Sequence, residues 1–235
     1  MAKRILVVLG LMVCIVGPAF AIPDFRLSAG TGLFFDGTGL GGIEASNSSF
    51  DHPVEIKWIN TAFSGFIFFD ATFAELSLGF SRGDSQIQIY RTGGDLSDEY
   101  FDKSLTNLNI SLLGKYPFWI TPRFSIFPLL GIDYLLALSM EDKGGSHKND
   151  ENLTNSQGGP LLAGDFNSLS LKLGMGLDYL FTERIFLRFN ALGGLRLANK
   201  FERDWVDVLN KDSRTSANTT PGIVLTVKLA VGFRF

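Results

Sequence analysis

The chain is poor in cysteine, histidine and charged residues. It has 1 cysteine and 2 histidines in 235 residues, and charged residues make up 19% of it. A single cysteine excludes a scaffold held by several disulfides. A hydrophobic content of 46% excludes an intrinsically disordered chain. The net charge of -3 does not favour nucleic-acid binding, so we expect no nucleic-acid partner. The length fits one large folded domain or two small ones.

The only long uncharged run lies at the N-terminus, over residues 5–22. Gly17-Pro18 interrupts this run, which weakens its interpretation as a membrane-spanning helix. Lys3-Arg4 precedes the apolar segment and the small-residue pattern Ala19-Phe20-Ala21 ends it. That order of charged, apolar and small residues is typical of a secretory signal peptide.

We therefore predict a signal peptide over residues 1–21 and a single mature domain over residues 22–235. A lipoprotein site at Cys14 is the alternative, but Val13 is a poor fit to the small residue that such sites have before the cysteine. Cleavage after Ala21 would leave a mature protein without cysteine, so its stability could not depend on disulfides.

Apolar and polar side chains alternate repeatedly along the chain, whereas no helical period stands out. In a strand, alternate residues lie on opposite faces, and segments such as 223–235 are apolar on one of them. The pattern predicts eight long strands, over residues 25–35, 56–69, 74–81, 107–116, 123–138, 168–179, 185–197 and 223–235. We expect a local break at Pro128, and the alternation does not decide which face of 56–69 is the apolar one.

The connections between these strands alternate between short and long. Short ones cover residues 70–72, 117–122 and 181–184, and long polar ones cover 36–53, 91–103, 139–165 and 199–220. In an up-and-down meander, all short turns would lie at one end and all four long loops at the other, as in transmembrane barrels. The predicted fold is an all-β, eight-stranded antiparallel up-and-down transmembrane β-barrel.

The charge distribution favours a barrel with its apolar faces toward lipid. The apolar faces of the predicted strands carry no charge, as expected where a lysine or arginine facing lipid costs about 2–4 kcal/mol. The alternative is a secreted lipocalin-like carrier, in which the two faces are reversed. In the membrane orientation the lumen holds the charges Arg26, Glu75, Lys115, Arg123, Asp133, Lys172, Asp178, Arg188, Arg196, Lys228 and Arg234. Glycines on the same face would leave room for these long side chains.

Aromatic residues gather near both ends of the predicted strands and suggest two interfacial girdles. Near the short turns lie Phe25, Phe73, Tyr116, Phe118, Trp119, Tyr179, Phe181, Phe233 and Phe235. Toward the long loops lie Trp58, Tyr90, Tyr134, Phe201 and Trp205. Ordinary packing in a core is the alternative explanation, because phenylalanine is abundant throughout the chain.

Two segments give the chain a family resemblance. The C-terminal residues 227–235, which end in Phe235, look like the assembly signal of small barrels, and residues 127–134 look like the strand after their central turn. The chain resembles the eight-stranded bacterial outer membrane proteins of the OmpX, OmpW and opacity-protein type. The resemblance implies residence in a bacterial outer membrane, contact with its lipid, and insertion by the barrel-assembly machinery. It implies an assembly signal that includes Val231, Phe233 and Phe235.

The sequence predicts no enzyme and no cofactor or metal site, because no Ser-His-acid or metal-ligating group can be placed on one inward face. The first functional hypothesis is a structural or surface-interaction protein. Its loops would contact a host or surface ligand, with Phe50, Trp205 and Val206 as candidate contacts. The second hypothesis is a narrow passive channel for small hydrophobic or anionic solutes, because cationic residues in a lumen favour anions.

Overall fold

A computed structural model describes residues 25–47, 54–91, 99–143, 162–210 and 215–235. The predicted signal peptide and the candidate contact Phe50 lie outside these residues. The strands are β1 (Leu27–Asn47), β2 (Val54–Ala71), β3 (Ala74–Arg91), β4 (Glu99–Lys115), β5 (Phe118–Thr121), β6 (Phe124–Asp142), β7 (Ser168–Leu180), β8 (Ile185–Asn199), β9 (Thr215–Thr220) and β10 (Gly222–Arg234). The helices are the 3-10 helix η3 (Ala163–Phe166) and α2 (Lys200–Leu209).

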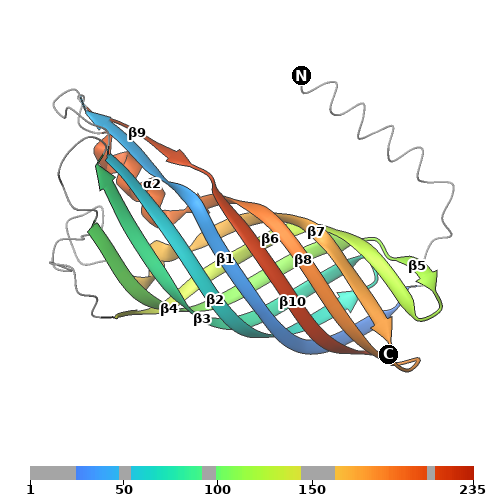
Figure 1. Cartoon of the computed structure of the whole chain (residues 1–235). Helices are drawn as coiled ribbons and strands as arrows, with labels where there is room; N and C mark the ends of the chain where they lie inside the picture. The colour runs from blue at the N-terminus through green and yellow to red at the C-terminus, as the bar shows by residue number, and fades with distance from the viewer. Residues whose placement is uncertain (1–24, 48–53, 92–98, 144–161, 211–214) are drawn as a thin grey trace, which may run out of the picture.

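All the strands belong to one antiparallel sheet that closes on itself (Figure 1). The ring runs in the order β1, β2, β3, β4, β6, β7, β8 and β10, and β10 closes it by pairing with β1 from Ser28↔Arg234 to Gly39↔Ile223. The short β5 pairs with β6 beyond the end of β4, and β9 pairs with β1 beyond the end of β10. The predicted eight-stranded up-and-down barrel is therefore confirmed.

The strands are longer than the alternation predicted. Strand extends into each of three expected long loops, 36–53, 91–103 and 139–165: β1 continues to Asn47, β4 begins at Glu99, and β6 continues to Asp142. The expected loop 199–220 contains α2 and β9. The backbone pairs in the same way beyond the membrane, but there apolar side chains such as Ile43 and Trp58 face the lumen and polar ones such as Glu44 face outward, so the alternation is reversed.

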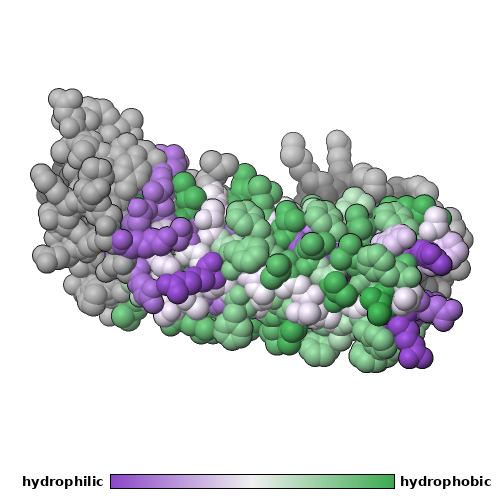
Figure 2. Space-filling model, turned by 60° about the horizontal axis from the view of Figure 1, so that its bottom comes forward, coloured by the Kyte–Doolittle hydropathy of each residue, from purple (hydrophilic) through white to green (hydrophobic). Residues whose placement is uncertain are grey.

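The outer face of the barrel is an apolar belt (Figure 2). Leu173 is 65% exposed, Phe80 64% and Leu225 62%, although side chains of this kind are normally buried in a soluble protein. The same orientation holds over residues 56–69, where Phe63 and Phe69 face outward and Phe68 faces inward. The orientation contradicts the lipocalin-like alternative, which needs a polar outer face. No helix in the described part of the chain is both long and apolar enough to cross a membrane.

The expected break at Pro128 does not occur. β6 runs without a register shift through the pair Pro128↔Met175. On its other side, the partner of β6 changes from β4, which ends at Lys115↔Leu129, to β5, which begins at Phe118↔Ile126. A proline has no N–H to donate, and this strand tolerates it where one neighbouring strand gives way to the next.

Aromatic side chains gather on the outside near the short turns, as predicted. Trp119 is 40% exposed, Phe181 55% and Phe235 80%. Neighbouring rings touch one another, for example Phe233 and Phe235 with ring centres 5.6 Å apart. At the other end Trp58 departs from the prediction, because it faces the lumen and is only 2% exposed.

Candidate functional site: the charged lumen and its mouth

Eight of the predicted interior charges lie on inward-facing positions and are enclosed by the wall. They are Glu75, Lys115, Asp133, Lys172, Asp178, Arg188, Arg196 and Lys228. Arg234 is half-buried at the short-turn rim. The prediction for Arg26 and Arg123 was wrong: both are exposed, since Arg26 precedes β1 and Arg123 lies in the turn before β6.

Arg188 is the centre of an ion-pair network near the short turns. Its Nε and Nη2 donate to the two carboxylate oxygens of Asp178 at 2.7 and 2.8 Å. Its Nη1 donates to Glu75 Oε2 at 2.7 Å, and its Nη2 lies 2.6 Å from Asp70 Oδ2. Lys115 pairs with the same Asp70 carboxylate. Three carboxylates thus surround one buried guanidinium, which has lost its water shell and needs such partners.

A second network lies halfway along the lumen, around Lys172. Its Nζ donates to Asp36 Oδ1 at 3.0 Å, to Asp133 Oδ2 at 2.7 Å and to Thr226 Oγ1 at 2.7 Å. The Thr226 hydroxyl in turn donates to Asp36. These residues come from β1, β6, β7 and β10, so the network ties together strands on different sides of the barrel.

Asp36 and Asp70 are functional residues that the sequence analysis missed, because it assigned them to a loop and a turn. Both are enclosed, with Asp36 6% and Asp70 4% exposed. The parity of Phe34 continues to Asp36, and this signal could have identified it. With these two acids the networks hold five carboxylates and three cations, so they do not share the excess of cations predicted for the lumen as a whole.

Aromatic rings separate the charged groups inside the barrel. The Arg188 guanidinium lies 4.8 Å from the ring centre of Phe68 and 5.0 Å from that of Phe186. Lys228 lies 5.4 Å from the ring centre of Phe66, and its Nζ donates to a serine hydroxyl at 3.0 Å. A cation over an aromatic face is attracted by the ring quadrupole, most strongly away from water.

Several inward-facing glycines make room for aromatic rings, and Gly222 makes room for the Arg196 guanidinium. A Cβ added to Gly176 would overlap the ring of Phe127, and one added to Gly232 would overlap the ring of Phe186. The lumen of an eight-stranded barrel is narrow, so a bulky ring on one strand requires a glycine on the next.

The mouth of the barrel, at the end opposite the short turns, is closed by an apolar cluster with η3 and α2 packed against it. We call the cluster the mouth cluster; it consists of Ile43, Trp58, Ile87, Leu105, Leu135, Ala137, Phe166 and Ala217. Figure 1 shows α2 within the end of the barrel, behind β1 and β2. Val206 of α2, predicted as an external contact, is partly buried and packs against the mouth cluster. Trp205 is placed on α2 and nothing more is described of its side chain.

One buried ion pair fastens α2 to the wall. Glu202 of α2 accepts a hydrogen bond from Arg196 of β8, and the Arg196 guanidinium lies 4.6 Å from the ring centre of Trp58. The Glu202 backbone N–H donates to Asn199 Oδ1 at 3.1 Å, which is a helix N-cap contact. Burial raises the pKa of the Glu202 carboxyl to about 7, although Arg196 acts to lower it.

A second contact holds the start of α2 against η3. Lys200 Nζ donates to Asp165 Oδ1 of η3 at 2.7 Å and lies 2.9 Å from Asp204 Oδ2. Its hydrogen bonds to these two carboxylates raise the pKa of Lys200. The two helices therefore dock together on the mouth cluster.

Little space is left between the networks. A cavity bordered by both lysines, Lys172 and Lys228, has a volume of about 10 Å³. That is about the smallest volume that can hold one water molecule. Within the described residues, no group of three or more His, Cys, Asp or Glu side chains could hold a metal ion.

A closed antiparallel barrel with an apolar outer belt and a charged, filled lumen defines a class, the transmembrane β-barrel.

No family model and no curated protein matches the chain. The solved structures to which the chain is similar include the following three proteins. The outer membrane protein OprG from Pseudomonas aeruginosa is 13% identical, with 90% of this chain and 96% of that chain covered and a TM-score of 0.47. Neisserial surface protein A is 13% identical, with 88% and 99% covered and a TM-score of 0.40. The outer membrane protease OmpT from Escherichia coli is 9% identical, with 91% and 99% covered and a TM-score of 0.42. Similarities this distant do not assign a function.

Proposed function

We propose that the chain is an integral outer membrane protein with a closed lumen, whose role is structural or to interact with surface ligands. The main support for a closed lumen is that its buried cations are paired with carboxylates. Arg188 and Lys172 both contact carboxylates, and the cavity beside Lys172 and Lys228 is about 10 Å³. A permeating ion would have to break these contacts, and the mouth cluster with α2 would block its exit.

Planar-bilayer conductance of the purified full chain tests this proposal. We expect no steady opening from the natural chain or from Arg203→Ser, which changes an exposed side chain of α2. We expect Lys172→Ser to give brief openings, because it removes the cation that joins Asp36 to Asp133. Steady conductance of the natural chain would overturn the closed lumen and support a narrow channel.

The location in the outer membrane is supported by the apolar belt and by the C-terminal strand. Val231 is 50% exposed, Phe233 41% and Phe235 80%, so all three face outward on or just after β10 and can be read by an assembly machinery. Deleting Phe235 is expected to lower the amount of folded barrel in bacterial membranes. Unchanged amounts would contradict its role as an assembly signal.

The surface-interaction role rests on the loop end of the barrel, where Phe50 and Trp205 remain candidate contacts. That the chain is not an enzyme and has no cofactor remains a prediction. This role is tested by measuring how well intact cells attach to a host surface. Cells that carry the natural chain are compared with cells that carry Trp205→Ala. We expect weaker attachment of the variant. Equal attachment would remove Trp205 from the proposal.

A further inference from the structure

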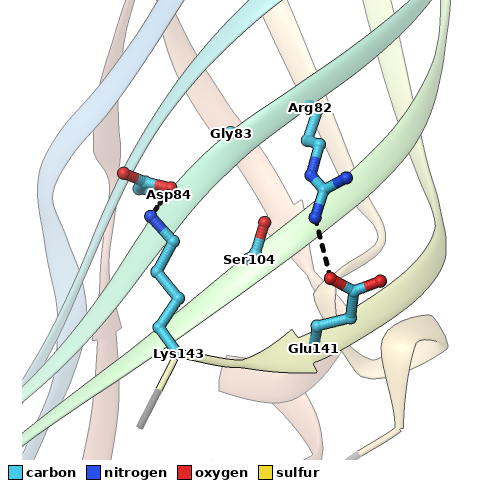
Figure 3. Close-up of a pocket in the computed structure, with 6 residues that line it drawn as sticks. All are labelled: Arg82, Gly83, Asp84, Ser104, Glu141 and Lys143. Carbon is cyan, nitrogen blue, oxygen red and sulfur yellow. Dashed lines mark hydrogen bonds and ion pairs between the residues drawn. The ribbon is translucent and has the colours of Figure 1, made fainter. Parts of the chain in front are cut away.

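The outer wall of β3, β4 and β6 carries a polar hollow on the loop-end side of the apolar belt (Figure 3). Its volume is about 400 Å³. It is lined by Arg82, Gly83, Asp84, Ser104, Glu141 and Lys143. The hollow is separate from the two lumen networks and from the mouth cluster.

Two ion pairs form the sides of the hollow. Arg82 Nη2 of β3 lies 2.8 Å from Glu141 Oε2 of β6, and Lys143, just after β6, pairs with Asp84 of β3. Both pairs cross over β4, which lies between β3 and β6 in the sheet. Ser104 of β4 lies between the two pairs in Figure 3 and is 7% exposed, so a small side chain forms the floor.

The hollow adjoins the lipid-facing belt. Arg82 follows Phe80 by two residues, so the two side chains lie on the same face of β3 about 6–7 Å apart. Phe80 is 64% exposed within the belt. The hollow therefore opens sideways, at the level where the belt ends and lipid headgroups begin.

The charges of the hollow are balanced and easily rearranged. Two cations and two carboxylates surround it, so a purely anionic group would meet both carboxylates. The side chains of Arg82 and Glu141 are 68% and 65% exposed. Exposed ion pairs contribute only about 0–1 kcal/mol, so a ligand can replace them at little cost. A ligand that carries one anionic and one cationic group can satisfy both signs at once.

We propose that this hollow binds a membrane lipid whose headgroup carries both a phosphate and a primary amine, as phosphoethanolamine does. The phosphate would contact Arg82 and Lys143, because arginine and lysine donate charge-assisted hydrogen bonds to phosphate oxygens. The ammonium would contact Asp84 and Glu141. The proposal rests on the membrane location proposed above.

Native mass spectrometry of the folded full chain tests the proposal. The chain is released from micelles that contain equal amounts of phosphatidylethanolamine, phosphatidylcholine and phosphatidylglycerol with identical acyl chains. We expect about tenfold more retained phosphatidylethanolamine than either other lipid, the factor that one hydrogen bond to a charged group supplies. Phosphatidylcholine has no N–H to donate, and phosphatidylglycerol has no cation. If the natural chain retained the three lipids equally, or preferred phosphatidylglycerol, that result would by itself overturn the proposal.

Two variants of equal charge change locate the site. Arg82→Gln with Glu141→Gln removes one ion pair of the hollow and is expected to abolish the preference. Glu55→Gln with Lys57→Gln removes a pair of 3.1 Å on β2, away from the hollow, and is expected to preserve it. Equal losses in both variants would contradict the assignment to the hollow. Displacement of the lipid by soluble glycerophosphoethanolamine would show that the hollow binds a free solute rather than a lipid, and would also overturn the proposal.

Failure of the lipid site can be distinguished from failure of the proposed function. Failure of the natural chain to enter micelles as a heat-modifiable, β-rich barrel would contradict the membrane location. A folded barrel without lipid preference would contradict only the lipid site.

Discussion

A charged side chain inside the barrel is stable only if other groups replace the water that it has lost. Arg188 meets this requirement with three carboxylates and three ring faces, and Lys172 meets it with two carboxylates and a hydroxyl. At this scale the sequence predicted most of the buried charges, because inward parity identifies them. It missed Asp36, Asp70 and Lys103, which lie beyond the visible alternation, and Glu202 on α2.

Replacing Arg188 by alanine is expected to destabilise the folded barrel by about 3–5 kcal/mol, because Asp178, Glu75 and Asp70 would be left buried with fewer partners. Urea unfolding in micelles, followed by tryptophan fluorescence, measures this change. Arg203→Ala, at an exposed position, serves as the control and is expected to have little effect. The same unfolding midpoint for both variants would show that the network does not stabilise the barrel.

A glycine can be tested at the same scale. Gly176→Ala is expected to cost about 1–3 kcal/mol, because the new Cβ would overlap the Phe127 ring in a packed lumen. Gly65→Ala is the matched control, since a Cβ there meets no atom within 4 Å. Unfolding midpoints in micelles compare the two, and a larger effect at Gly65 would contradict the packing described.

At the scale of elements, the alternation located strands wherever one face touches lipid. It failed where the apolar side chains change to the lumen face, as in residues 39–47 of β1, where Ile43 is buried in the mouth cluster and Glu44 is exposed. These residues pair with β2 and β9. It also gave no sign of α2, a short helix within a polar segment of 199–220. The docking of α2 depends on contacts with distant strands, such as Glu202 with Arg196, which a local pattern does not show.

The docking of α2 is expected to depend on pH. The pKa of Glu202 rises from its ordinary value of 4.5 to about 7 when α2 is docked, so the docked state holds the proton more tightly. Docking is therefore most favourable below about pH 4.5 and weakens as the pH rises through 7. Among the described residues, Arg196 donates to the Glu202 carboxylate, and Asn199 Oδ1 accepts from the Glu202 backbone N–H.

Hydrogen exchange of the α2 amides between pH 5 and pH 8, corrected for the intrinsic rate, measures this dependence. We expect protection to fall with rising pH in the natural chain and to vary much less in Glu202→Gln, which keeps the shape of the side chain without its titration. The β8 amides provide the internal control. Protection of α2 that increases with pH would contradict the raised pKa.

At the scale of the whole molecule, the orientation of the wall determines which side chains face lipid and which fill the lumen. An apolar outer belt and a lumen of paired charges, rings and glycines fit a membrane and would be unstable in the reverse arrangement. The sequence sufficed for this conclusion, because a charge facing lipid is costly enough to be excluded from every strand. The sequence could not show that the lumen is closed, because closure depends on which charges meet across the barrel.

The most direct test of the account is the environment of the outer face. Spin labels are placed one at a time at Leu130, Leu173 and Leu225, in a chain with Cys14 changed to serine and reconstituted in lipid bilayers. These positions are 58%, 65% and 62% exposed. We predict that oxygen, which concentrates in lipid, relaxes all three labels strongly, and that a water-soluble nickel complex does not. A label at Arg203 is expected to be relaxed strongly by the nickel complex and weakly by oxygen. Strong relaxation of the three belt labels by the nickel complex would contradict a barrel embedded in a membrane.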